Sequence, residues 1–140
     1  MSARIVAEAR GWIGTPYRHG TSAKGAGCDC LGLVRGVWRA LEGAEPEAVP
    51  PYARHEPGAG ETLRDAALRH LREIPPREAK PGDLLLFRLR PNTPARHLGL
   101  LSGPASFIHA YEGHGVVESP LGPPWQRRIV AAFALTERIG

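Results

Sequence analysis

The spacing of apolar residues changes at Pro81-Gly82-Asp83, and this change limits the folds open to the chain. Before that turn, apolar residues recur at helical spacing in three segments: residues 2–13, 30–42 and 61–74. After it come short apolar or alternating runs separated by Gly and Pro, as strands are: residues 84–89, 97–101, 106–111, 116–118 and 129–135. Helices followed by strands predict an α+β fold with an antiparallel sheet. Residues 44–60, rich in Pro, Gly and Glu, are predicted to be an irregular surface segment.

The size and composition of the chain predict one domain over residues 1–140. Its 140 residues are 42% hydrophobic and 23% charged, which suits a single core and excludes a wholly disordered chain. No apolar run approaches the roughly 20 residues of a membrane span. Residues 1–13 carry charges and no continuous apolar segment, so we expect synthesis in the cytoplasm without a signal peptide.

The charge balance is basic, with 18 Lys and Arg against 14 Asp and Glu. Such a surface favours anionic partners, including nucleic acid, phospholipid or an anionic cell-wall polymer. Arg provides 16 of the 18 cations, and together with 17 Gly and 14 Pro this also fits GC-rich coding. The chain has no block of Lys and Arg and no basic stripe interleaved with aromatics, so we expect no nucleic-acid partner.

Two cysteines, Cys28 and Cys30, are separated only by Asp29. A disulfide across so short a ring is hard to form, which leaves an inert thiol, a metal ligand or a nucleophile. Cys30 would begin a helix capped by Asp29, where the positive end of the helix dipole favours a thiolate. Cys30 is therefore the candidate nucleophile, although it could equally be a small apolar residue at the start of a buried stripe.

Two of the six histidines, His97 and His109, belong to predicted strands joined by a short connection at residues 102–105. A turn centred on Gly103 would place the two histidines directly opposite each other on one face of the sheet. A slip of one residue would place them on opposite faces. Such a pair can supply a general base and the group that orients it, or can be two half-buried histidines without a chemical role.

The same residues allow a zinc site made of Cys28, Cys30, His97 and His109. Zinc sites usually separate paired cysteines by two to four residues, so one intervening residue is tight. The predicted helix also directs Cys30 inward while Cys28 precedes the cap. We therefore expect no metal, and keep a zinc-binding module as an alternative.

Five motifs in order give the chain a family resemblance. They are Gly14-Thr15-Pro16-Tyr17-Arg18-His19-Gly20, Asp29-Cys30-Leu31-Gly32-Leu33-Val34, Pro81-Gly82-Asp83-Leu84, His97-Leu98-Gly99-Leu100 and Phe107-Ile108-His109-Ala110. With these motifs, nearly the whole chain resembles the NlpC/P60 cysteine peptidases. The resemblance is closest to the phage-type cell-wall peptidases that accompany tail genes and gene transfer agents.

This resemblance implies a papain-like fold, with N-terminal helices packed on a C-terminal antiparallel sheet and no cofactor. It implies hydrolysis of peptidoglycan stem peptides, often between γ-D-glutamyl and a diamino acid. Carried over by position, Cys30 is the nucleophile, His97 the base and His109 the orienting third residue. Tyr17 matches a tyrosine near the oxyanion or the substrate amine, and Asp29 matches an acidic residue that contacts substrate.

Two positions depart from the family pattern. Leu31 stands where Ser is usual, and Arg96 precedes the candidate base where a small polar residue is common. Cys28 matches no catalytic position, and its role is left open. The expected partners are the stem peptide and phage-tail or particle proteins, with action at the cell wall after delivery or lysis. A non-catalytic tail component that keeps the fold, or an amidase or acyltransferase with the same dyad, remains an alternative.

Overall fold

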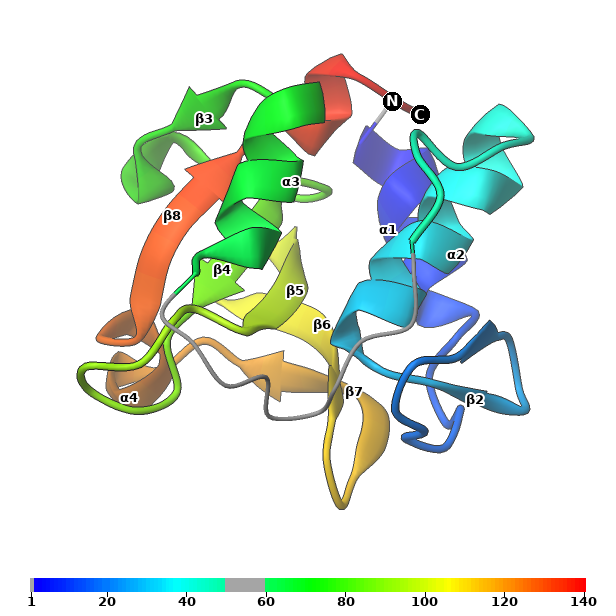
Figure 1. The fold of residues 1–140 in the computed structure, drawn as a ribbon, viewed down its shortest axis with the longest axis horizontal. Helices are drawn as coiled ribbons and strands as arrows, with labels where there is room; N and C mark the ends of the chain where they lie inside the picture. The colour runs from blue at the N-terminus through cyan, green and yellow to red at the C-terminus, as the bar shows by residue number, and fades with distance from the viewer. Residues whose placement is uncertain (1, 50–59) are drawn as a thin grey trace.

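The computed structural model describes residues 2–49 and 60–140. The three longer helices, α1 (Ser2–Arg10), α2 (Cys30–Glu42) and α3 (Thr62–His70), lie on one side of a six-stranded sheet (Figure 1). The strands of the sheet are β3 (Glu73–Ile74), β4 (Leu84–Phe87), β5 (His97–Gly103), β6 (Ser106–Tyr111), β7 (Gly115–Pro120) and β8 (Ile129–Phe133). They lie in the order β3-β8-β4-β5-β6-β7 with antiparallel pairing throughout. The predicted α+β fold is confirmed.

Helix α2 carries the clearest local signals, and the structure follows them. The Asp29 side chain accepts a hydrogen bond from the Gly32 backbone N–H, which caps the helix as predicted. Gly43 ends it with a φ of 83°, a left-handed conformation that glycine adopts without strain. The buried side of α2 packs against α1, β5 and β6. The cap therefore fixes where α2 begins, and with it the position of Cys30 over the sheet.

Strand alternation divides the apolar residues into two clusters. One lies between the sheet and the helices and includes Leu84, Leu98 and Leu100. The other lies on the opposite face, includes Phe87 and Phe107, and has Trp125 of the short helix α4 (Pro123–Gln126) packed against it. Both faces of the sheet are therefore covered.

Several predicted boundaries are wrong. The helix expected to reach Ile74 ends at His70, because Glu73 and Ile74 pair with the edge of β8 as strand β3. Helix α1 ends at Arg10, and β4 ends at Phe87. The two-residue strands β1 (Ser22–Ala23) and β2 (Gly27–Cys28) were not predicted. Two single-turn 3-10 helices, η1 (Pro76–Glu78) and η2 (Leu135–Glu137), complete the described elements.

Of the irregular segment predicted for residues 44–60, residues 50–59 lie outside the described residues, and 44–49 form no helix or strand. None of the described helices is long and apolar enough to cross a membrane.

Candidate active site

Cys30 is the first residue of α2 and is 9% exposed. Its thiol donates a hydrogen bond to the carbonyl oxygen of Arg96, at 3.5 Å. Burial raises the pKa of Cys30 to about 12, and the nearby charge of Asp29 adds to the effect. Backbone N–H groups, with Leu98 first among them, act in the opposite direction. The sequence predicted that the helix start would favour a thiolate, and this prediction is wrong for the resting protein because burial outweighs it.

The raised pKa predicts a characteristic pH dependence for alkylation of Cys30. In a Cys28→Ala variant, the rate of reaction with iodoacetamide should rise about tenfold per pH unit from pH 7 to 10, since only the thiolate reacts. At pH 7 it should be at least about a hundredfold slower than for an unperturbed cysteine. Mass spectrometry of the labelled peptide measures the rate. A rate that stays constant down to pH 5 would show instead that a thiolate–imidazolium pair exists before substrate binds.

Cys28 lies on β2 and is fully buried. Burial raises its pKa to about 12, with a smaller contribution from Asp29. Both cysteines are free thiols. A protonated, fully buried thiol is a poor nucleophile, so Cys28 makes the weaker candidate.

The structure brings His97 and His109 together. Nε2 of His97 lies 2.7 Å from Nδ1 of His109, and Nε2 of His109 lies 2.9 Å from Oγ of Ser119. His97 is 4% exposed and His109 is fully buried. Three side chains from β5, β6 and β7 thus form one continuous hydrogen-bonded row across the sheet.

The predicted register of the two strands is wrong by two residues. Leu100 pairs with Ile108 and Leu101 with Phe107, a register centred on Pro104 and not on Gly103. The register then shifts, and Gly103 pairs with Ser106 across the turn at Pro104-Ala105. Continued along the strands, this register places His109 beside Gly99 and not beside His97. The two histidines still share a face, because a shift of two residues preserves the side to which a side chain points.

Aromatic rings enclose the histidine pair. The Trp125 ring stacks on His97 with centroids 5.7 Å apart and meets His109 edge-on at 5.1 Å. Phe87 and Tyr111 also contact the His97 ring. Burial lowers the pKa of His97 to about 3, with a further contribution from His109. Burial likewise lowers the pKa of His109 to about 4, so both rings are neutral at pH 7.

Cys30 and His97 lie on opposite sides of the β5 backbone: Cys30 belongs to the cluster on the helix side, and the His97 ring packs against Phe87 on the other face. The described contacts of the Cys30 sulfur are with the backbone of Arg96 and Leu98, the residues on either side of His97. The described hydrogen bond of the His97 ring is to His109. The resting structure therefore places the two groups at the same end of the strand and leaves the thiol hydrogen-bonded to a carbonyl. Catalytic hydrogen bonds often form only once substrate is bound.

Asp29 holds the glycine-rich loop against the start of α2. Besides capping the helix at Gly32, its carboxylate accepts a hydrogen bond from the Gly20 N–H at 2.8 Å. Nδ1 of His19 lies 3.9 Å from the same carboxylate. A Cβ on Gly32 would overlap the carbonyl oxygen of Thr21, so the loop can approach only because position 32 is glycine. The cap predicted for Asp29 is confirmed, and its contact with substrate stays a prediction.

Tyr17 is half-buried and bridges to Cys28 of β2 through the backbone. It packs against the core cluster beneath the helices and lines the same pocket as Cys30 and Asp29. The structure therefore brings Tyr17 to the pocket that contains Cys30, and its place near the oxyanion or the substrate amine stays a prediction.

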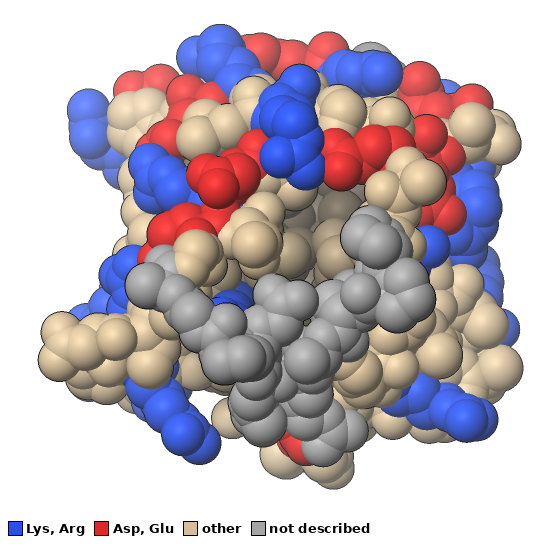
Figure 2. Space-filling model, viewed as in Figure 1, with Lys and Arg blue, Asp and Glu red and all other residues tan. Residues whose placement is uncertain are grey.

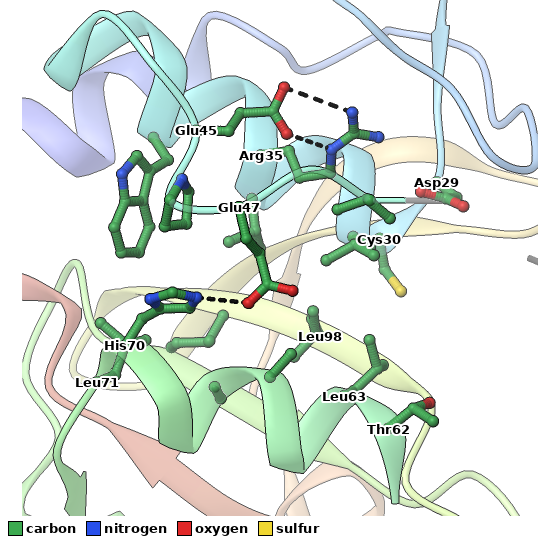
Figure 3. A pocket seen from close by; sticks show the side chains of 18 of the residues that line it. Asp29, Cys30, Arg35, Glu45, Glu47, Thr62, Leu63, His70, Leu71 and Leu98 are labelled. Atoms are coloured by element: carbon green, nitrogen blue, oxygen red, sulfur yellow. Dashed lines mark hydrogen bonds and ion pairs between the residues drawn. The ribbon is translucent and has the colours of Figure 1, made fainter. Parts of the chain in front are cut away.

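A pocket of about 350 Å³ runs between α2 and α3 (Figure 3). Cys30 and Asp29 lie at one end, and the ion pair between Glu47 and His70 lies toward the other. Figure 2 shows the hollow on this face, with most of the visible Asp and Glu side chains in the upper half of the view. The walls between the two ends are largely apolar, and they include Leu31, Val34, Leu63, Ala67, Leu71 and Leu98. The thiol therefore lies at one end of a largely apolar pocket between α2 and α3.

Among residues 2–49 and 60–140, no group of three or more His, Cys, Asp or Glu side chains is placed to hold a metal ion. His97 and His109 bond to each other, and the Cys30 thiol bonds to a carbonyl oxygen. The four residues considered for zinc are therefore engaged in other contacts or buried separately.

Sequence reasoning missed Ser119 and Trp125. The predicted strand ended at residue 118, one residue before Ser119, although alternation from Val117, the partner of His109, would have placed Ser119 on the histidine face. Nothing in the sequence around Trp125 indicates a place in the site, since it is a single aromatic residue after Pro123-Pro124. Its contacts depend on the packing of α4 against the sheet, which spacing along the sequence does not reveal.

Comparisons with known proteins agree on one family. The sequence model of the NlpC/P60 family matches residues 14–134. The murein DD-endopeptidase/LD-carboxypeptidase MepS of Escherichia coli K12 is 31% identical over 139 residues, which are 99% of this chain and 65% of that protein. A γ-DL-glutamyl hydrolase of Bacillus subtilis is 32% identical over 117 residues, 84% of this chain and 25% of that protein. This chain thus spans under two thirds of the length of either.

The solved NlpC/p60 domain of the peptidoglycan hydrolase SagA superposes with a TM-score of 0.70 and 27% identity. The match covers 96% of this chain and 98% of that domain. The peptidoglycan hydrolase RipB of Mycobacterium tuberculosis has the same fold, with a TM-score of 0.66 at 21% identity over 96% of this chain and 64% of that chain.

Proposed function

The chain belongs to the NlpC/P60 family, and from this premise we propose that it is a cysteine peptidase that cleaves the stem peptides of bacterial peptidoglycan. The observation that carries the proposal is the hydrogen-bonded row from His97 through His109 to Ser119, at the end of β5 where the Cys30 thiol also lies. The names of the relatives support the substrate class, since they include murein endopeptidases and a γ-DL-glutamyl hydrolase.

The row of hydrogen bonds orders the protons needed for catalysis. When Nε2–H of His97 donates to Nδ1 of His109, the lone pair on Nδ1 of His97 stays available as a base. The proton of His109 is then on its Nε2 and is donated to Oγ of Ser119. The opposite direction would place the His97 proton on Nδ1 and remove the base. We therefore assign Ser119 the role of acceptor that selects the active tautomer.

In the proposed reaction, the Cys30 thiol leaves the Arg96 carbonyl and gives its proton to His97. The sulfur attacks the carbonyl carbon of the scissile amide, and the oxyanion is stabilised by the Cys30 N–H and the Tyr17 hydroxyl. His97 then protonates the leaving amine as the C–N bond breaks, which gives a thioester. Water gives one proton to His97 and its hydroxyl to the acyl carbon. The thiolate then leaves and regains the proton.

The apolar groove between α2 and α3 supports an extended peptide substrate, since it leads from Cys30 past several uncharged side chains. The test is digestion of purified peptidoglycan, with the fragments identified by mass spectrometry. We expect fragments cleaved between γ-D-glutamyl and the diamino acid. Fragments cut elsewhere in the stem would correct the bond, and intact peptidoglycan beside a folded protein would favour a non-catalytic role.

We also propose that the protein acts with phage-tail or gene-transfer-agent particles and reaches the cell wall by delivery or lysis. The support is the resemblance of the five sequence motifs to that branch of the family. Recovery of the protein in purified particles, detected by mass spectrometry, would test the association. Its absence from particles made by the same cells would contradict it.

Replacement of Ser119 tests the proposed tautomer. Ser119→Ala should lower kcat about fivefold to tenfold with little change in KM, as the loss of one hydrogen bond of about 1 kcal/mol implies. Ser119→Thr keeps the hydroxyl and should retain most of the activity. Nitrogen NMR of labelled His97 should show the proton on Nε2 in the parent and a mixture in Ser119→Ala. Equal kcat in all three proteins would remove Ser119 from the mechanism.

A further inference from the structure

The excess of positive over negative charge is confined to two stretches of sequence. Residues 84–111 and 119–136 contain five arginines and no Asp or Glu. The remaining residues carry thirteen Lys and Arg against fourteen Asp and Glu, so they are almost neutral. The whole net charge of +4 therefore comes from these two stretches, although they are separated in sequence by residues 112–118.

The fold places the two stretches side by side. Strands β4 and β8 pair, and just beyond their last pair the Arg88 N–H donates to the Arg128 carbonyl oxygen at 2.8 Å. On the other side of β4, Phe87 pairs with His97, so Arg88 and Arg96 each lie one residue beyond that pair. The loop after β4 and helix α4 accordingly meet at one end of the sheet in Figure 1. Arginines thus lie at the sheet end next to the candidate base.

These arginines line a second pocket of about 560 Å³. Its lining contains Arg88, Arg90, Arg127 and Arg128, with no acidic residue among the described residues that form it. Arg90 and Arg127 are exposed. Like charges held close together destabilise a fold unless an anion or a partner offsets them.

Two of the four are partly engaged within the protein. Arg88 donates to the Thr93 carbonyl oxygen and lies 3.6 Å from the Glu61 carboxylate. The guanidinium of Arg128 lies over the Trp125 ring, 5.5 Å from its centroid. These contacts hold two of the guanidinium groups in place at the side of the pocket, next to the ring that covers His97. Preformed, closely spaced guanidinium groups match carboxylates, which they can bind through two parallel hydrogen bonds.

We propose that this pocket binds carboxylate groups of the peptidoglycan chain and so holds the polymer beside the active site. The inference rests on the proposed function, which brings the protein to a polymer whose stem peptides carry carboxylates. Arg96 lies between the two pockets. It lines the pocket that contains Cys30, and it follows the Phe87–His97 pair on the same side as Arg88 of the arginine pocket. A nucleic acid is the less favoured ligand, since the lining of the pocket contains no aromatic side chain for stacking.

The test measures binding in a Cys30→Ala background, so that the polymer is not digested. Arg90→Gln/Arg127→Gln removes two charges from the pocket, and the matched control Arg4→Gln/Arg77→Gln removes two exposed charges from α1 and η1. Cosedimentation with purified sacculi free of other wall polymers gives the affinity. We expect a loss of fivefold or more for the pocket variant and less than twofold for the control. Binding of the parent should weaken as salt is raised.

Amidated sacculi, in which the carboxylates have been converted to amides, separate carboxylate recognition from general adhesion. The parent should bind them as weakly as the pocket variant binds untreated sacculi. Equal loss in the pocket and control variants, or unchanged binding to amidated sacculi, would overturn the proposal. Tighter binding to a DNA oligonucleotide than to sacculi, lost in the pocket variant, would identify a nucleic-acid site instead. Hydrolysis by the parent is measured separately, so a failed peptidase test leaves this binding result interpretable.

Discussion

Replacement of Cys30 by Ala should abolish peptidoglycan hydrolysis, with a fall in kcat/KM of at least about a thousandfold and no loss of fold. The reason is that no other described thiol can reach the groove, since Cys28 is fully buried on β2. The change removes one sulfur from a side chain at the start of α2 and leaves the Asp29 cap intact. Digestion of sacculi with the variant, together with circular dichroism, measures both effects.

Cys28→Ala is the matched control, because it removes the same atom two residues away. We expect it to retain activity within about threefold and to lose at most a few kcal/mol of stability from the small cavity. A comparable loss of activity in both variants would show that the nucleophile is misassigned or that the two thiols act together. Full activity in Cys30→Ala would refute the peptidase mechanism altogether.

The second large effect is loss of stability in acid. Both His97 and His109 have pKa values held down by burial, to about 3 and about 4, whereas the unfolded chain takes up protons near 6.5. Between those values the unfolded state binds more protons, so the free energy of unfolding must fall as the pH drops. Each histidine contributes about 1.4 kcal/mol per pH unit, which amounts to at most about 4 kcal/mol between pH 7 and 5. Stability from this source is fully present above pH 6.5.

Urea unfolding at a series of pH values measures this slope, and NMR titration of the two rings reports their pKa values directly. Trp125→Ala is the informative variant, since it exposes both rings to water and should raise their pKa values. Its stability should therefore depend less on pH between 7 and 5 than that of the parent. A parent protein equally stable at pH 7 and pH 5 would contradict the burial of neutral histidines.

The parts of the fold that sequence predicts well are those with local signals. The Asp29 cap, the Gly43 stop and the apolar stripe between them define α2 almost to the residue. The prediction that His97 and His109 share a face of the sheet is correct, although the predicted register is not. A shift of two residues leaves each side chain on the same face. The motifs around Cys30 and His97 are enough to indicate the family whose model matches residues 14–134.

What sequence could not predict depends on contacts between distant segments. The spacing of apolar residues predicts a helix through Ile74, but Glu73 and Ile74 form strand β3 in the structure. Pairing with β8 outweighs the local helical preference. Ser119 lay one residue beyond a predicted strand, and Trp125 reaches the histidines only after α4 has packed on the sheet. The raised pKa of Cys30 followed neither from its motif nor from its place at a helix start, since burial of the thiol outweighs both.

The place of β8 in the sheet determines when the sheet can be completed as the chain is synthesised. Residues 129–133 follow every other strand in the sequence, yet they lie between β3 and β4. Until they leave the ribosome, β3 has no strand to pair with and β4 keeps one edge open. Trp125 of α4, and Arg127 and Arg128 of the arginine pocket, are also made late. A nascent chain therefore encloses its two histidines only after α4 and β8 have been made, later than the other strands of the described sheet.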